Sequence, residues 1–187
     1  MTYQIFKFIH ILGFILLGGG LIGVFIADLR SRRTRDIEVV AEACRYVALF
    51  YDAVVVPGAI FIGLSGLFLT IKGGFGFFDL PWQTGMWTLF VFEFVEGNTI
   101  TRIHFRRMLK LSKDALARGT VTEGLKAEQG KKLPAFTHFL DLPLFFLIAA
   151  FGALRPSSWG AVIFGVILAL SAGAVLALIL PGRYKTA

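Results

Sequence analysis

Five long apolar stretches recur along the chain, and each is long enough to cross a lipid bilayer as a helix. A bilayer core needs about 20 apolar residues in helical conformation, and only helices and closed barrels satisfy their backbone hydrogen bonds inside lipid. The stretches occupy about residues 3–29, 46–71, 82–103, 133–154 and 157–180. The sequence therefore predicts an all-α fold: one polytopic transmembrane helix bundle over residues 1–187, with five spans.

The composition agrees with this fold class. Hydrophobic residues make up 56% of the 187 positions and charged residues 17%, which is more apolar surface than a single soluble core can bury. The net charge of +7 would favour nucleic-acid binding in a soluble domain. Here the basic residues lie in blocks between apolar stretches, so they indicate topology and no nucleic-acid partner is expected. The single cysteine, Cys44, excludes an intramolecular disulfide.

The distribution of Lys and Arg predicts the orientation of the bundle. Most of the 19 basic residues lie in two loops, at about residues 30–45 and 104–132, and in the carboxyl-terminal tail with Arg183 and Lys185. Because basic loops stay on the cytoplasmic side, we expect the amino terminus outside and the carboxyl terminus inside. A four-span bundle, with both termini on one side, is the alternative.

Two glutamates interrupt the third apolar stretch. Glu93 and Glu96 lie near the middle of a predicted span, where carboxylates are costly, face the bundle interior and mark functional sites. At about 1.5 Å rise per residue, Glu93 falls near the midplane and several other polar residues fall in the cytoplasmic half. Glu93 shares a helix face with Glu96, and His138 with Asp141, because each pair is three residues apart. We expect one buried polar cluster, made of Asp52, Glu93, Glu96, Asn98, His138 and Asp141.

Three interpretations of this cluster remain open. The first is a transition-metal site for Mn, Fe or Zn, since carboxylates and imidazole on facing helices suit those ions. Its ligands would be Glu93, Glu96, His138 and Asp141. The paired Glu-x-x-His motif of such sites is absent, which weakens this interpretation. The second is a proton relay or substrate path, and the third is a structural cluster satisfied by Arg102, Asn98 and Tyr51.

The three histidines invite a comparison with membrane cytochromes, in which histidines within helices bind haem b. Two axial histidines lie close together across the iron, whereas His10 falls roughly 9 Å to the outer side of the midplane. His10 therefore cannot pair with His104 or His138, but it suits a single axial ligand. A pair of His104 and His138 is sterically allowed, and an unligated, hydrogen-bonded histidine is the alternative at each position.

A family resemblance begins in the first apolar stretch. The run from Phe6 to Gly20 resembles the start of a bacterial family of predicted integral membrane proteins, domain-of-unknown-function family twenty-two sixty-nine. That family shows Lys-x-x-His followed by a Gly-rich stretch, an Arg-rich loop, and an Asp before aromatic residues, Pro and Gly. The matching positions here are Lys7, His10, Gly18, Gly20, Asp52, Pro57 and Gly66. Arg106, Arg107 and Met108 and the region 134–156 also look similar. The resemblance implies a multi-pass protein of the bacterial inner membrane.

A more distant similarity covers only Lys7, His10 and the glycines that follow. It is to small membrane protoporphyrinogen oxidases and to copper-resistance D-type proteins. In the oxidases a first-helix histidine is implicated in haem binding, so the similarity implies haem b at His10. The later set of Glu93, Glu96, His138 and Asp141 belongs to neither group's pattern.

Three functions from different classes follow, and the sequence leaves open whether the protein is an enzyme. The first is a haem-associated redox protein using His10. The second is a proton- or ion-coupled small carrier using Glu93, Glu96 and Asp52. The third is a non-catalytic membrane subunit or assembly factor. We also expect anionic lipid headgroups at the Arg-rich loops, and a homo-oligomer packed through glycine faces such as Gly19-x-x-x-Gly23.

Overall fold

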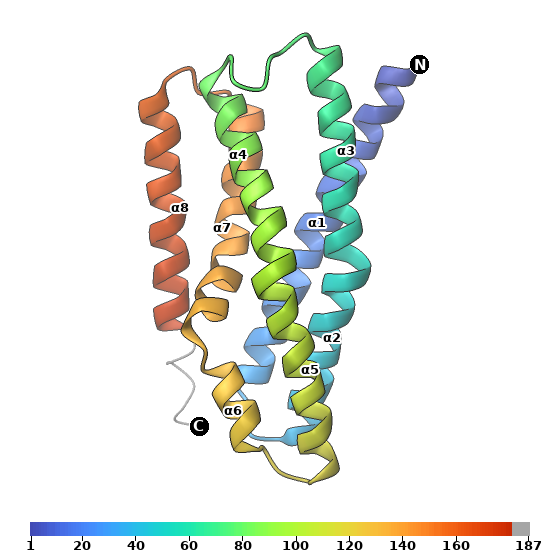
Figure 1. Ribbon diagram of the computed structural model, residues 1–187, viewed down its shortest axis with the longest axis vertical. Coiled ribbons are helices and arrows are strands. Elements are labelled where there is room, and N and C mark those ends of the chain that lie inside the picture. Colours follow the sequence, from blue (N-terminus) through green and yellow to red (C-terminus); the bar gives the residue numbers. More distant parts are fainter. Residues whose placement is uncertain (181–187) are drawn as a thin grey trace.

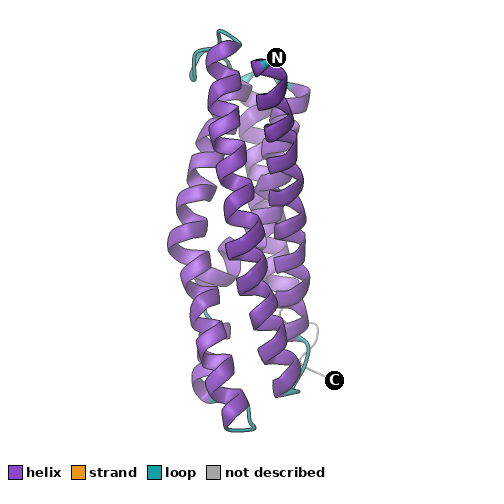
Figure 2. Ribbon diagram, turned by 90° about the vertical axis from the view of Figure 1, so that its right-hand side faces the viewer, coloured by secondary structure: helices purple, strands orange, loops and turns teal. Residues whose placement is uncertain are grey.

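The computed structural model describes residues 1–180, which are helices joined by short connections, without strands (Figure 2). The predicted all-α fold is therefore confirmed. Arg183 and Lys185, which contributed to the predicted orientation, lie outside the described residues. The elements are α1 (Thr2–Arg32), α2 (Ile37–Phe50), the π-helical turn η1 (Tyr51–Val55), α3 (Val56–Lys72), α4 (Pro81–Glu96), the π-helical turn η2 (Gly97–Thr101), α5 (Arg102–Ala117), α6 (Glu123–Gln129), α7 (Lys132–Leu154) and α8 (Trp159–Ile179).

The described residues form five long rods (Figure 1). α2, η1 and α3 make one rod and α4, η2 and α5 another, because the backbone keeps right-handed helical angles at each junction. α1, α7 and α8 are the other three. Successive rods run in opposite directions, so the amino terminus lies at one end of the bundle and the end of α8 at the other.

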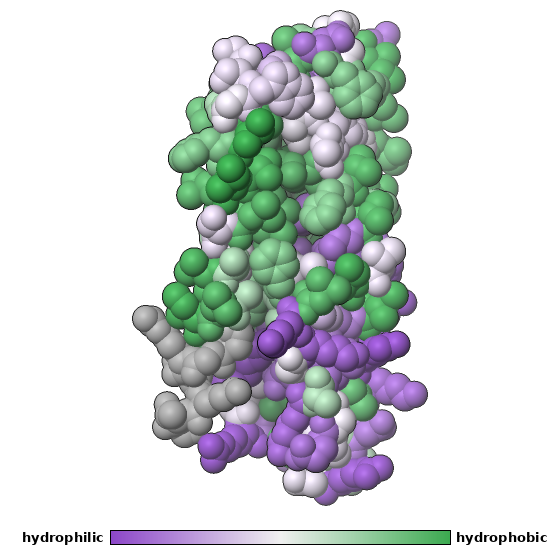
Figure 3. Space-filling view, turned by 60° about the vertical axis from the view of Figure 1, so that its left-hand side comes forward, coloured by the Kyte–Doolittle hydropathy of each residue, from purple (hydrophilic) through white to green (hydrophobic). Residues whose placement is uncertain are grey.

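One end of the bundle is rich in exposed Lys and Arg, and we call it the basic end. It carries α6 and the connections at 33–36 and 118–122. Its exposed cations include Arg33, Arg35, Lys113, Arg118 and Lys126. Figure 3 shows the same division on one face, where hydrophobic side chains cover the middle of the molecule and hydrophilic ones gather at the lower end.

Four helices of the described chain are long and apolar enough to cross a membrane: Thr2–Arg32, Ile37–Lys72, Lys132–Leu154 and Trp159–Ile179. The rod from α4 to α5 is not among them. Its apolar part, α4, has only 16 residues and carries Glu93 and Glu96. The five-span count and the orientation therefore stay predictions.

Both predicted cytoplasmic loops are largely helical. Asp36 accepts a hydrogen bond from the Glu38 backbone N–H at 2.9 Å and caps α2. No Gly or Pro follows before Pro57, so the helix continues directly into the next predicted span. In the second loop α5 extends to Ala117, and the short helix α6 follows it.

The two π-helical turns have local causes and lie against each other. Pro57 has no N–H and its ring crowds the carbonyl four residues earlier, and η1 is the widened turn directly before it. η2 begins at Gly97, where an added Cβ would lie 2.5 Å from the Tyr51 hydroxyl oxygen. Only glycine at position 97 leaves the Tyr51 hydroxyl its place, so the two turns meet at this contact.

Close helix crossings hold the bundle together. α1 and α3 approach so closely that a Cβ at Gly58 would lie 2.6 Å from the Leu17 backbone nitrogen. Gly23 lies against the Phe50 ring of the same chain, whereas a Cβ at Gly19 would meet nothing within 4 Å. The predicted Gly19-x-x-x-Gly23 face is thus divided between an internal contact and open space. α8 buries only Val162, Ala169 and Gly173, which fits the outer wall of the bundle.

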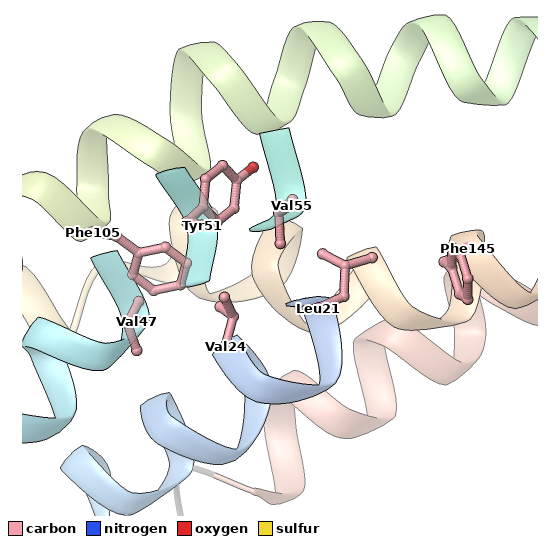
Figure 4. Close-up of a cluster of buried hydrophobic side chains, with 7 residues drawn as sticks. All are labelled: Leu21, Val24, Val47, Tyr51, Val55, Phe105 and Phe145. Atoms are coloured by element: carbon pink, nitrogen blue, oxygen red, sulfur yellow. The ribbon is translucent and has the colours of Figure 1, made fainter. Parts of the chain in front are cut away.

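A buried apolar cluster ties four rods together (Figure 4). Its members are Leu21, Val24, Val47, Tyr51, Val55, Phe105 and Phe145. They come from α1, α2, η1, α5 and α7. The Tyr51 hydroxyl points out of this cluster toward the rod of α4 and α5 (Figure 4). The cluster fixes one wall of the cavity described next.

Candidate functional site

A cavity of about 340 Å³ lies between α1, η1, α3, α4 and α7. This volume falls in the range of small-molecule sites. Its walls are mostly apolar and include the aromatic side chains Phe14, Trp87, Phe90, Phe94 and Phe145. Its polar lining residues are His10, Tyr51, Glu93, Asn98 and Asp141. The site thus combines an aromatic enclosure with two carboxylates and one imidazole.

His10 is fixed by a hydrogen bond on one side of its ring. Its Nδ1 lies 3.0 Å from the Ser65 hydroxyl, and that hydroxyl donates to the Phe61 carbonyl oxygen. Because the hydroxyl proton is used there, Ser65 accepts from His10 Nδ1–H. His10 Nε2 then carries a lone pair, so it can accept a hydrogen bond from a ligand in the cavity. Gly66 makes room for the ring, since its added Cβ would lie 3.3 Å from His10 Cε1.

Glu93 and Asp141 line the cavity without a Lys or Arg partner among the described residues. Glu93 makes no hydrogen bond or ion pair with any described residue. Asp141 Oδ2 lies 3.6 Å from His138 Nδ1 and has no hydrogen-bond partner. The two carboxylates are close enough to interact electrostatically with each other and with Glu96. Glu93 and Asp141, both members of the predicted buried cluster, thus line the same cavity.

Behind Asp141, on the side toward the basic end, lies a buried group that the sequence analysis missed. Asp28 Oδ2 accepts a hydrogen bond from Arg32 Nε at 2.6 Å and lies 3.5 Å from His138 Nε2. Asp28 and His138 are 3% and 2% exposed. The available signal was Asp28-x-x-x-Arg32, an acid and a base one helical turn apart, but its place at the end of an apolar stretch suggested solvent.

Glu96 is buried in a small hydroxyl network. One carboxylate oxygen accepts from the Thr101 hydroxyl at 2.8 Å, and that hydroxyl lies 3.1 Å from the Thr137 hydroxyl. The other carboxylate oxygen has no partner. Thr101 stands at the end of η2, five residues beyond Glu96, so the π-helical turn brings the two together.

Asp52 and Asn98 belong to a different group. Asp52 accepts from Arg102 Nε at 2.7 Å and from Arg106 Nη2 at 3.1 Å. Asn98 accepts from Arg102 Nη1 at 3.2 Å. The Asp52 side chain is 38% exposed, so it lies outside the buried acids. The predicted six-residue cluster therefore separates into a buried acid group and an arginine-paired group, although Asn98 also reaches the cavity lining.

The donor sets for a metal or haem are incomplete within the described residues. No three His, Cys, Asp or Glu side chains there converge in metal-binding geometry, so the geometry adds no support for the predicted metal set. For haem, His10 is the single histidine that lines the cavity. The lining contains carboxylates where haem propionates need cations. These side chains do not fit haem.

His104 also lies away from the cavity. Its Nδ1 is 3.0 Å from Glu128 Oε1, and Lys131 Nζ is 2.7 Å from the other Glu128 oxygen. Burial lowers the pKa of His104, and the hydrogen bond with Glu128 opposes that shift without cancelling it. Neither His104 nor His138 lines the cavity, so the predicted pairing of these two across a haem finds no space there.

Comparison with known proteins places the chain in a family of membrane proteins. The family model described as "Predicted integral membrane protein (DUF2269)" matches residues 4–156. The matched region begins within α1 and ends two residues after α7, so it leaves out α8. It includes every residue that lines the cavity. No curated protein and no solved structure matches the chain.

Proposed function

Because this chain belongs to the DUF2269 family of predicted integral membrane proteins, we propose a function for the cavity within its helix bundle. It binds a small organic cation and releases a proton in exchange, as a proton-coupled carrier does. One observation carries the proposal: Glu93 and Asp141 line an aromatic cavity with no Lys or Arg partner among the described residues.

The physical argument starts from the cost of buried charge. An ionised carboxylate inside a low-dielectric bundle needs a proton, a hydrogen-bonded partner or a cation. Among the described residues Glu93 has no such partner, and the one basic group paired with Asp141 is His138. When the cavity holds no cation, the pair therefore retains a proton. An entering cation replaces that proton as the neutralising charge, so binding and proton release are linked.

The walls suit an organic cation better than a hydrated metal ion. Trp87, Phe90 and Phe145 line the cavity, and a cation over an aromatic ring gains about 0.5–2 kcal/mol, the upper end when it is desolvated. His10 Nε2 and the Tyr51 hydroxyl add hydrogen-bonding groups that fix a ligand's orientation. An apolar cation with one polar group matches this combination.

For the protein as a whole we propose five membrane crossings, with the basic end in the cytoplasm of a bacterial cell. The rod from α4 to α5 lies among the four apolar rods and runs in the alternating order (Figure 1). The basic end offers exposed Arg and Lys to anionic lipid headgroups. Reporters fused to the two ends of the chain test this count, and finding both on one side of the membrane would favour four crossings.

The binding proposal is tested with ethidium, a permanently charged aromatic cation, added to the full chain in lipid nanodiscs. Fluorescence titration should show saturable binding that weakens as the pH falls, because protons compete for the acid pair. Loss of one charge-assisted contact costs about 1.5–3 kcal/mol, so Glu93→Gln and Asp141→Asn should each weaken binding roughly tenfold to a hundredfold. Asp52→Asn is the matched control, since Asp52 is an acid outside the cavity lining.

Two results would count against the proposal. Neutral pyrene binding as tightly as ethidium would mean that the cavity selects apolar surface and not charge. Equal ethidium affinity in Glu93→Gln, Asp141→Asn and the unmodified protein would remove the carboxylates from the site.

A further inference from the structure

We propose that His138 and Asp28 form a proton path between the cavity acids and the basic end of the bundle. The inference rests on the proposed function, because the path serves the proton that Glu93 and Asp141 release. It assigns a role to two buried residues that do not line the cavity.

The His138 ring stands between two carboxylates on different helices. Its Nδ1 lies 3.6 Å from Asp141 Oδ2, on the cavity side. Its Nε2 lies 3.5 Å from Asp28 Oδ2, on the other side. Both separations exceed a normal hydrogen bond of about 2.7–3.2 Å by only a few tenths of an ångström. A small rotation of the ring or of either carboxylate is enough to close each contact.

Aromatic side chains surround the His138 ring. Phe105, Phe139 and Phe25 pack around the ring with centroid distances of 5.0, 5.1 and 6.2 Å. The charged groups that act on it are Asp28 and Arg32 from α1, Glu96 from α4, and Asp141 from its own helix. An imidazole between two acids, enclosed by aromatic rings, can pass protons only along the line that joins those acids.

A purely structural histidine would be expected to satisfy its ring nitrogens. Buried polar groups in proteins are nearly always hydrogen-bonded, because an unpaired one is costly. Here His138 Nδ1, His138 Nε2 and Asp141 Oδ2 are all buried without a hydrogen-bond partner. Three adjacent unsatisfied atoms in one line are costly for stability, but they suit groups that gain and lose a proton.

The transfer balances without any further reactant. Asp141 begins protonated, the His138 ring carries its proton on Nε2, and Asp28 is ionised. The Asp141 O–H bond breaks as a proton moves to Nδ1, and the Nε2–H bond breaks as a second proton moves to the Asp28 carboxylate. Asp141 is left ionised beside the cation in the cavity, and Asp28 passes its proton to water. A tautomer change then returns the ring proton from Nδ1 to Nε2, and Asp141 stays ionised until the cation leaves and a proton returns.

The far end of the path is hydrogen-bonded to the last residue of α6. Arg32 Nε donates a hydrogen bond to Asp28 Oδ2 at 2.6 Å, which fixes the carboxylate beside the His138 ring. Arg32 Nη1 in turn donates to the Gln129 carbonyl at 3.0 Å, and Gln129 Nε2 donates to the Ser31 hydroxyl at 3.4 Å. Gln129 is the last residue of α6, which lies at the basic end (Figure 1). Protons therefore leave on the side with the exposed cations.

The test measures how fast the proton appears. Full-length protein in nanodiscs is mixed rapidly with ethidium in a weakly buffered solution that contains a pH indicator dye. Calorimetry on the same samples gives the number of protons released at equilibrium. We expect His138→Gln and Asp28→Asn to slow proton release roughly a hundredfold, the lower end of what a positioned proton-transfer group contributes. Asp52→Asn, which removes another arginine-paired carboxylate, should release protons at the normal rate.

A second variant separates proton transfer from support of the fold. His138→Ala leaves space for a free imidazole molecule, and added imidazole should restore fast release, whereas a packing role would not respond to a proton-carrying solute. If His138→Gln fails to bind ethidium, the rate of proton release in Asp28→Asn tests the path instead. Asparagine keeps an oxygen that accepts the hydrogen bond from Arg32, so this variant is expected to keep the local structure. Release at the normal rate in both path variants would overturn the path and leave the proposed function standing. No proton release from the unmodified protein would overturn the proposed function itself.

Discussion

Replacing Gly58 with alanine tests the close crossing of α1 and α3, on which the cavity depends. A Cβ at Gly58 would lie 2.6 Å from the Leu17 nitrogen and 3.0 Å from Leu17 Cα. These are backbone atoms, which cannot swing aside, so α1 must retreat by about 0.8 Å to reach an ordinary contact of about 3.4 Å.

The cost follows from the size of that retreat. A gap of about 0.5–1 Å removes roughly a quarter to a half of the ~0.1–0.2 kcal/mol that each atom pair contributes. Over a few tens of pairs at the crossing the loss is about 1–2 kcal/mol. The better helix propensity of alanine offsets about 0.5–1 kcal/mol. We therefore expect Gly58→Ala to lower the free energy of unfolding by about 1 kcal/mol, at the lower end of the usual range for overpacked sites.

Gly19→Ala is the matched control, because its Cβ would meet nothing within 4 Å. It should be neutral or stabilising by up to about 1 kcal/mol. Both variants are unfolded at equilibrium in mixed micelles of sodium dodecyl sulfate and a non-ionic detergent, followed by circular dichroism. Equal stabilities for Gly58→Ala and Gly19→Ala would refute the close-crossing argument.

Three further predictions concern single contacts. Gly97→Ala should destabilise the protein by about 1–3 kcal/mol. The loss should be smaller in a Tyr51→Phe background, because the hydroxyl that the new Cβ would meet is gone. Additive effects of the two substitutions in a double-mutant cycle would show that residues 97 and 51 are not in contact. The lowered pKa of His104 means that the unfolded chain binds more protons as the pH falls below about 6.5, so stability present at neutral pH should be lost on acidification, with a smaller slope in His104→Gln. Visible spectra of purified protein should lack a Soret band, because the cavity lining does not fit haem; a band that disappears in His10→Ala would reverse this conclusion.

The helices were predictable from the sequence because few backbone structures satisfy their hydrogen bonds inside lipid. Uninterrupted apolar stretches of about 20 residues define helix positions by length alone, and the observed α1, α7 and α8 follow the predicted ranges closely. The boundaries at the basic end were harder to predict. α2 begins nine residues before the predicted second span, because a charged but Gly- and Pro-free segment remains a good helix former in water.

The candidate site was predictable only in part. The depth of a residue in the bundle can be estimated from its position in the sequence. Its contacts depend more on the direction in which its side chain points around the helix axis. Depth assigned Glu93, His138 and Asp141 to one cluster, but it also included Asp52, whose side chain is paired with Arg102. The estimate separated His10 from the acids, yet one cavity touches both. Asp28 was missed because a charge at the end of an apolar stretch is usually solvated, whereas here neighbouring helices and α6 cover it.

The two π-helical turns could not be read from the sequence. Pro57 indicated a disturbance in its helix, but nothing in the residues around Gly97 distinguishes a widened turn from an ordinary one. Their positions matter for the site, since η1 carries Tyr51 and η2 carries Asn98, and both residues line the cavity.

Proton release on cation binding is the most direct test of the central claim. Calorimetric titration of the protein with ethidium, repeated in two buffers of different ionisation enthalpy, yields the number of protons released per cation bound. We predict about one proton for the unmodified protein, since one cation replaces one neutralising proton, and none for the double variant Glu93→Gln with Asp141→Asn. Ethidium binding without proton release from the unmodified protein would contradict the account.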